Sequence, residues 1–249
     1  MQKDLLVGFS ILVILVLVLV AVFNVQPETL KDSTSEIKTP EIKQPETISQ
    51  SVVTINLPAV DNEGNGVVAR LKVQLISGEG RILTNINQLL FWVDTQFSIR
   101  IAEMVAENIT GKDLSDVDLI YTIETNASVI EGQSAGAALT IATIAAIENK
   151  TLPTDVMITG TINPDGTIGP VGAIFAKAKA SKEVGAKIFL VPEGQGTQTN
   201  YRPEKKCEQV GPVTFCTTEY KPEKIDISKD AGVEVKEVST INDALKYFI

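Results

Sequence analysis

A serine and a lysine carry the chemistry that this sequence can support. The sequence has no histidine, which excludes a Ser-His-Asp or Cys-His catalytic set, a HExxH zinc site and a histidine pH switch. Acid-base chemistry must therefore use Lys, Asp, Glu, Tyr or Cys side chains. Of these, lysine is the strongest candidate for a base that activates a serine hydroxyl.

Ser134 stands where a loop turns into a predicted helix. Gly132 and Gly136 flank it, and glycines let the backbone turn tightly and let a substrate chain come close. The free N–H groups and the positive end of the helix dipole at such a place are the parts of an oxyanion hole. The alternative is that Ser134 only caps the helix.

Lys177 is the base that helical periodicity selects. It falls on the same side of its predicted helix as Ala173, Ile174, Ala180 and Val184, whereas Lys179 and Lys182 fall on the other side. A buried amine has a lowered pKa, and a neutral lysine can accept the serine proton. The alternative is a lysine at the edge of the helix whose stem is buried while its ammonium reaches solvent.

Alternating strands and helices must position these two residues. Hydrophobic patterning predicts strands at residues 52–57, 67–75, 118–124, 187–191 and 233–238. It predicts helices at residues 86–107, 134–148, 172–184 and 241–248. Residues 156–168 predict two short strands joined through a turn at Asn163-Pro-Asp-Gly166. The fold class is α+β with a mixed sheet.

Two of these segments have clear apolar periods. In residues 67–75, apolar side chains alternate with Arg70, Lys72 and Gln74, which is the period of a half-buried strand. In residues 86–107, the apolar side chains form a helical stripe that consists of Ile86, Leu90, Val93, Phe97, Ile101 and Met104.

Composition limits the other functions of the chain. Its 249 residues suffice for one domain of up to about 200 residues plus an appendage. The net charge of -9 lacks the basic excess that nucleic-acid binding requires. The sequence has no GxxxxGK[ST] phosphate loop, and its two cysteines are too few for a four-thiolate zinc site. We therefore expect no ATPase activity, cofactor or metal site in this chain.

The N-terminal segment predicts a membrane anchor. Residues 5–23, after a flank of residues 1–4, form an apolar run that only Gly8 and Ser10 interrupt, long enough to cross ~30 Å of hydrocarbon. A cleaved signal peptide is the alternative, but its apolar region would be shorter. The lysines flanking the run give little orientation, while Cys207 and Cys216 suit an oxidising exterior. We expect a single-pass protein with its domain outside the cytoplasm.

A tether and one domain follow the predicted anchor. Residues 24–51 include a stretch rich in Pro, Glu, Lys, Ser and Thr that cannot bury a core. Residues 52–249 form the domain. Within it, residues 194–225 are an insertion in which a turn at residues 210–213 separates two short extended arms bearing Cys207 and Cys216. A disulfide-closed hairpin is expected there, serving as a substrate-facing flap, an oligomer contact or a plain surface excursion.

Four ordered motifs resemble the proteolytic domain of Lon proteases. They are GQSAG at 132–136, TGTINPDG at 159–166, PVGAIFAK at 170–177 and IFLVP at 188–192. The resemblance spans residues 67–249 and is greatest to the membrane-attached, Lon-like serine proteases of archaea. It implies a Lon-type α+β fold and a serine endopeptidase that acts on polypeptides. It also implies a homo-oligomer, with a hexameric ring as the family's form.

The resemblance assigns roles to individual residues. The family's Ser-Lys dyad falls on Ser134 and Lys177, and the threonine that hydrogen-bonds the lysine falls on Thr159. Glu131 takes the place of an acidic residue just before the nucleophile. The loop whose backbone shapes the oxyanion site contains Gly132, Gln133 and Ala135.

The chain departs from the family pattern in three places. Gln133 stands where many members have proline, Thr161 replaces an acid, and Ala173 replaces the second glycine of the motif before the lysine. The family's ATPase module has no counterpart in this sequence. Two other functions therefore stay open: a catalytically silent, membrane-tethered peptide-binding or assembly protein, and the protease subunit of a complex with a separate ATPase.

Overall fold

The computed structural model describes residues 50–85, 93–125 and 132–249. The described residues belong to one compact unit. The expected flank, the membrane anchor, all but the last residues of the tether and Glu131 lie outside the described residues. Within the described ranges, no helix has both the length and the apolar character needed to cross a membrane.

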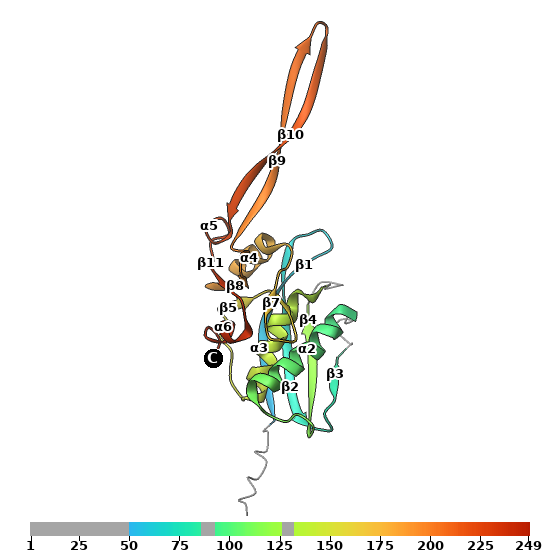
Figure 1. The fold of residues 1–249 in the computed structure, drawn as a ribbon, viewed down its shortest axis with the longest axis vertical. Coiled ribbons are helices and arrows are strands. Elements are labelled where there is room, and N and C mark those ends of the chain that lie inside the picture. Colours follow the sequence, from blue (N-terminus) through green and yellow to red (C-terminus); the bar gives the residue numbers. More distant parts are fainter. Residues whose placement is uncertain (1–49, 86–92, 126–131) are drawn as a thin grey trace, which may run out of the picture. The chain divides into compact units, whose positions relative to one another are not determined.

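A four-stranded sheet forms one side of the domain (Figure 1). Its order is β1-β2-β4-β3, made from β1 (Ser51–Val60), β2 (Gly66–Ser77), β4 (Val117–Glu124) and β3 (Ile82–Thr84). Neighbours pair antiparallel except β3 and β4, which are parallel. Along β2, Ala69, Leu71, Val73 and Leu75 are buried, which confirms the predicted alternation.

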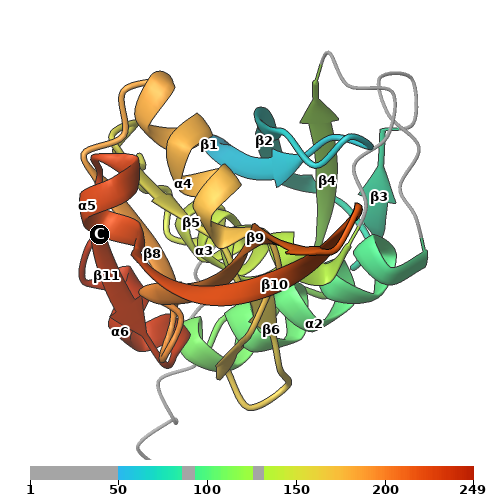
Figure 2. The same cartoon turned by 90° about the horizontal axis from the view of Figure 1, so that it is seen from above.

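A helix buried on all sides occupies the centre of the core. The short 3-10 turn η1 (Gln133–Ala135) leads into α3 (Gly136–Ile147), in which every residue is buried. Its side chains are mostly alanine and isoleucine, and a helix that is apolar all round is typical of an interior position. It packs against α2 (Val93–Thr110), β1 and β2 (Figure 2).

A smaller parallel sheet and three helices complete the domain. The sheet has the order β11-β8-β5 and consists of β11 (Glu234–Val238), β8 (Ile188–Pro192) and β5 (Val156–Ile158). The helices are α4 (Ile174–Glu183), α5 (Ile227–Ala231) and α6 (Ile241–Leu245). The strands β6 (Thr161–Ile162) and β7 (Ile168–Gly169) form a small hairpin. The amide of Gly166 donates to the carbonyl of Asn163 at 2.9 Å, as the predicted turn requires.

Of the apolar stripe predicted at residues 86–107, Ile86 and Leu90 lie outside the described residues, Ile101 is partly buried against the core, and the other three members are exposed. In α2, the side chains of Val93 and Phe97 are 82% and 57% exposed, and Met104 is also exposed. The buried side carries mostly small residues: Thr95, Ser98, Ile99, Ala102, Val105 and Ala106. Small side chains let α2 lie close against α3, so packing selects that side although the opposite side is rich in large apolar residues.

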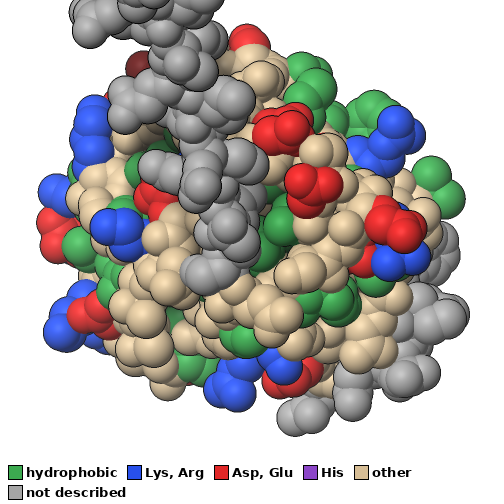
Figure 3. Space-filling model, turned by 90° about the horizontal axis from the view of Figure 1, so that it is seen from below, with side chains coloured by type: hydrophobic (Ala, Val, Ile, Leu, Met, Phe, Trp, Pro, Cys, Tyr) green, Lys and Arg blue, Asp and Glu red, His purple; other side chains and the backbone are tan. Residues whose placement is uncertain are grey.

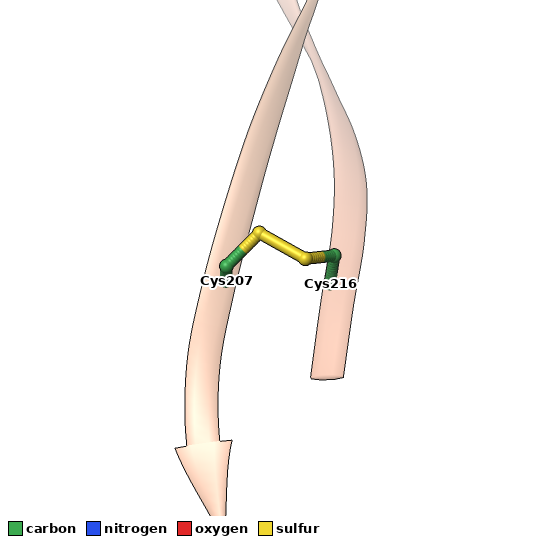
Figure 4. Close-up of a disulfide and its surroundings, with 2 residues drawn as sticks. All are labelled: Cys207 and Cys216. Carbon is green, nitrogen blue, oxygen red and sulfur yellow. A yellow bond between two sulfur atoms is a disulfide. The ribbon is translucent and has the colours of Figure 1, made fainter. Parts of the chain in front are cut away.

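The insertion forms a long β-ribbon instead of two short arms. The strands β9 (Thr197–Val210) and β10 (Val213–Asp226) pair antiparallel over their full length, and nearly all of their residues are exposed (Figure 1). Cys207 and Cys216 lie opposite each other and are joined by a disulfide (Figure 4). On the face of the domain away from the ribbon, the part that the view shows has small groups of apolar side chains among charged ones (Figure 3). The short helix α5, which follows β10, was not predicted from the sequence.

Candidate active site

Ser134 and Lys177 line the same cavity, which has a volume of about 420 Å³. Its wall is formed by the start of α2, the turn η1, the loop before α4 and the first turn of α4. A larger cavity of about 560 Å³ lies at β2 and the end of β4. That cavity contains neither the serine nor the lysine, so the smaller cavity is the candidate active site.

Ser134 is the middle residue of η1 and does not cap a helix. The residues in the N-cap positions of η1 and α3 are Gly132 and Ala135, and neither makes a side-chain capping bond. Ser134 is partly exposed, whereas the helix that follows it is buried. Its hydroxyl therefore has access to the cavity, next to the N-terminal end of α3.

Lys177 is almost fully buried, with 3% of its surface exposed. It lies on α4 between Ile174 and Ala180, which are buried, while Lys179 and Lys182 are exposed. Periodicity also places Ala173 and Val184 on this side, and both are exposed. The burial of Lys177 is as periodicity predicts, and it excludes a lysine that reaches out to solvent. Burial lowers the pKa of Lys177 to about 8, because desolvation disfavours the ammonium form.

Thr159 connects the lysine to the serine loop. The Lys177 Nζ donates to the Thr159 Oγ1 at 3.3 Å, and this hydroxyl donates to the carbonyl oxygen of Ser134 at 3.3 Å. Thr159 follows β5 directly and is fully buried, and its own amide donates to the carbonyl of Leu190 in β8. The small parallel sheet therefore holds the residue that touches both halves of the candidate site.

Backbone contacts hold the serine loop against the segment after β5. The Gly160 amide donates to the carbonyl of Ser134, and the Ala137 amide donates to the carbonyl of Gly160, both at 3.0 Å. Gly136 makes this close approach possible, because a Cβ atom there would lie 2.7 Å from the Ile162 backbone nitrogen. Gly132, with φ 103° and ψ 159°, adopts a conformation that essentially only glycine tolerates.

The remaining predicted residues divide into lining and neighbouring positions. Gly132, Gln133 and Thr161 line the cavity, and so does Ala173, whereas Ala135 is buried behind Ser134. Ala173 has φ 56° and ψ 33°, the left-handed region that favours glycine. A glycine, which the resemblance implies at this place, would adopt this backbone conformation without strain. Among the residues that the structure describes, no group of His, Cys, Asp or Glu side chains is arranged to hold a metal.

Two residues at or beside the cavity were missed in the sequence. Asp94, in the first described turn of α2, lines the cavity. Gln195 holds the cavity wall from behind, because its side-chain amide accepts from the Val171 N–H at 2.9 Å and donates to the Val171 carbonyl at 2.8 Å. Asp94 falls within a predicted helix without any motif around it, and Gln195 contacts a residue that is distant in the sequence. Nothing in the sequence near either residue indicates its place.

Comparison with protein families gives one match, at residues 94–217, to the Lon protease (S16) C-terminal proteolytic domain. The match includes Ser134, Thr159 and Lys177 as well as all of β9 and the start of β10.

Three relatives illustrate the extent of the similarity. The archaeal Lon protease of Thermoplasma volcanium is 37% identical over 89 residues, which are 36% of this chain and 14% of that protein. The archaeal Lon protease of Archaeoglobus fulgidus is 26% identical over 157 residues, 61% of this chain and 25% of that protein. Lon protease 2 of Bacillus subtilis is 30% identical over 112 residues, 41% and 20% of the two chains. The chain thus aligns with a quarter or less of each relative's length.

Proposed function

Because this chain belongs to the Lon protease family through its S16 proteolytic domain, we propose that it is a serine endopeptidase in which Lys177 activates Ser134. The observation that supports this most strongly is the buried lysine. Its amine shares a cavity with the serine, has a pKa near 8 and is hydrogen-bonded to the threonine that holds the serine loop.

The geometry suggests a role for each group in the reaction. The neutral amine of Lys177 takes the proton from the Ser134 hydroxyl as the oxygen attacks the scissile carbonyl. Backbone N–H groups in residues 132–135 hold the negative oxygen of the tetrahedral intermediate. The ammonium then gives its proton to the leaving amine, and the acyl group stays on Ser134 until water, deprotonated by the same lysine, releases it. Thr159 orients the lysine throughout.

The proposed substrates are extended or unfolded polypeptides. The sequence contains no phosphate loop with which to couple ATP hydrolysis to unfolding, so a substrate must present a flexible segment by itself. We further propose that residues 5–23 anchor the chain in a bilayer with its domain outside the cytoplasm, since their 19-residue apolar run is the length of a membrane-spanning helix. Carbonate extraction of membranes tests the anchor, and protease protection tests the side.

Cleavage of β-casein by the full chain without ATP tests the proposed activity. We expect Ser134→Ala and Lys177→Ala to lose at least ~10³-fold in rate, since both groups act in the chemical step. The control is Ser115→Ala, which removes an exposed serine and should leave the rate unchanged. An inert parent that cleaves casein only with an added ATPase would favour the partner-dependent protease. A parent that binds unfolded protein without cleaving it would favour the silent binding protein.

The pH dependence tests the role of the lysine separately. The neutral form of Lys177 increases as pH rises through about 8, so kcat/KM for a peptide substrate should rise about tenfold per pH unit below this value and level off above it. The measurement is a pH profile at constant ionic strength. A rate that stays constant from pH 6 to pH 9 would be inconsistent with a lysine base.

A further inference from the structure

The β9–β10 ribbon has two chemically different faces. Residues directly opposite each other share a face, and faces alternate along each strand. One face, which we call the apolar ribbon face, carries Tyr201, Pro203, Cys207, Cys216, Tyr220 and Pro222, with the polar residues Thr199, Lys205, Gln209, Thr214, Thr218 and Lys224 among them. The other face carries the charged residues Arg202, Glu204, Lys206, Glu208, Glu219, Lys221 and Glu223, and near the turn also the apolar Val210, Val213 and Phe215.

The charged face contains two ion pairs, and its exposed apolar side chains Val210, Val213 and Phe215 lie near the turn, whereas the apolar ribbon face exposes tyrosines farther from the turn. Lys206 pairs with Glu219 at 2.6 Å, and Lys221 pairs with Glu204. On the apolar ribbon face, Tyr201 and Tyr220 are 65% and 66% exposed. A two-stranded ribbon without a core is marginally stable in water, so large aromatic side chains on one side of it indicate a surface that another molecule covers.

Two prolines make the edges of the ribbon unfavourable for adding a strand, so a partner is expected to bind to a face of the ribbon. The Cα atoms of Cys207 and Cys216 are 4.0 Å apart, which is the short spacing of a pair without ladder hydrogen bonds. The pairs Pro203–Tyr220 and Tyr201–Pro222 have the same parity, so the nitrogens of both prolines point outward from the ribbon. An added strand would need N–H groups there, and proline has none.

The chain itself displays a second uncovered apolar surface of matching size. The exposed side chains of Val93, Phe97 and Met104 lie along one side of α2, and we call them the α2 stripe. From Val93 to Met104 the helix rises roughly 17 Å, and from Tyr201 to Cys207 the ribbon advances about 20 Å. The two surfaces are therefore similar in length.

Charge is also complementary between the two surfaces. Lys205 and Lys224 lie on the apolar ribbon face, and Glu107 lies beside the α2 stripe with Glu103 one turn before it. Glu103 is half-buried and its pKa is raised, first by desolvation and then by the nearby Glu107, while Arg100 lowers it. Two carboxylates beside one guanidinium leave a net negative charge that a further cation would offset. Arg100 lies within the α2 stripe and can stack on a tyrosine ring of the ribbon.

We propose that the apolar ribbon face of one copy packs on the α2 stripe of a second copy of this chain. The two surfaces are different, so the contact is heterologous and produces a closed ring or an open chain of copies. The ribbon of one copy would then lie against α2 of the second copy, and Asp94 at the start of that helix lines the second copy's cavity. The inference goes beyond the proposed protease activity and does not require it.

Site-specific photo-cross-linking of the full chain in detergent micelles tests this contact. The probe is p-benzoylphenylalanine in place of Tyr220, and the matched control has it in place of Thr217, on the charged face. We expect light-dependent dimers only from position 220, with the cross-linked peptide lying within residues 93–110. Cross-links only to added β-casein, only to detergent or lipid, or to another part of the second copy would overturn the proposal. The experiment is done on the Ser134→Ala background, so its outcome is independent of proteolysis.

A charge exchange tests the same contact without a probe. Lys205→Glu should reduce the oligomer fraction in analytical ultracentrifugation at least tenfold, and adding Glu107→Lys should restore most of it. The control Lys206→Glu changes the charged face and should have a much smaller effect. Lys205 is exposed, whereas Glu107 is partly buried and accepts from the Leu114 N–H, so far-UV circular dichroism verifies the fold of each variant. An oligomer that is insensitive to Lys205→Glu, or equally sensitive to Lys206→Glu, would contradict the proposal.

Discussion

The candidate active site and the β9–β10 ribbon differ in which side chains they bury and which they expose. At the site, a lysine is 3% exposed and α3 is buried from Gly136 to Ile147. In the ribbon, Tyr201, Phe215 and Tyr220 are at least 60% exposed. The site thus buries a charge-bearing group, and the ribbon exposes groups that normally form a core.

The two regions also differ in how they are stabilised. The central helix and its sheets supply burial of apolar surface, and part of that stability is used to keep an amine out of water. The ribbon has only its ladder, its ion pairs and one disulfide. Changes at the site should therefore alter activity and global stability together, whereas changes in the ribbon should leave the rest of the domain intact.

The largest expected effect is an inverse change of activity and stability at Lys177. The pKa of this lysine is about 8 in the folded chain and roughly 10.4 when unfolded, so at pH 7 the folded state holds a buried ammonium. We expect Lys177→Met to abolish proteolysis and to raise the free energy of unfolding at pH 7 by about 2 kcal/mol. The parent should itself gain stability as pH rises from 8 to 10.5, while the variant should not. Urea denaturation at several pH values measures both.

Lys182 provides the control for this prediction. It is on the same helix but exposed, and Lys182→Met should change the free energy of unfolding by less than about 0.5 kcal/mol and leave the cleavage rate unchanged. If Lys177→Met destabilised the chain as a core defect does, the lysine would be packed as part of the core and not held under an electrostatic cost.

The core-facing strands and the two candidate catalytic residues were predictable because each follows from a local pattern. Alternation in β2 reflects one buried face, and the position of Lys177 follows from helical periodicity. Ser134 was marked by its flanking glycines, and the structure explains Gly136 by its contact with Ile162. These signals lie within a few residues of the feature that they predict.

Other features depend on contacts between distant segments and could not be predicted in this way. The side of α2 that is buried is decided by the fit of Ala102 and Ala106 against α3, not by which side has larger apolar residues. The link from Gln195 to Val171 joins segments 24 residues apart. The length of the ribbon was underestimated because charged residues and prolines in its strands are unfavourable for a buried strand, whereas this ribbon is exposed on both faces.

Replacing one glycine in each region by alanine tests whether the core and the ribbon unfold separately. Gly136→Ala should destabilise the domain by about 2 kcal/mol and reduce activity, because the new methyl group would collide with Ile162. Gly211→Ala, in the turn of the ribbon, meets open space but has φ 63°, and it should cost about 1 kcal/mol locally. Thermal unfolding followed by circular dichroism should show a lower Tm only for Gly136→Ala. Equal shifts of Tm would mean that the ribbon unfolds together with the core.

Removal of the disulfide tests whether the stability of the ribbon affects the rest of the domain. Cys207 and Cys216 close a short loop, so their replacement by serine should destabilise the distal ribbon by about 2 kcal/mol. The global Tm and casein cleavage per chain should hardly change, since few ribbon residues pack on the domain. Hydrogen exchange of β9 and β10 amides is the measurement, and exchange faster in the ribbon alone is the expected result. Faster exchange in α3 as well would show that the two regions are coupled.

The smallest expected effect is at Ala173, where the site itself holds a strained residue. Its left-handed backbone costs an alanine roughly 1–2 kcal/mol, and glycine would relieve this while losing some entropy from the more flexible unfolded chain. Ala173→Gly should therefore raise the free energy of unfolding by only about 0.5 kcal/mol. Ala176→Gly, within the same helix, is the matched control and should instead lower it by about 1 kcal/mol. Two losses of similar size would show that the left-handed conformation at position 173 is not the one the chain adopts in solution, and that the wall of the cavity beside Lys177 is differently built.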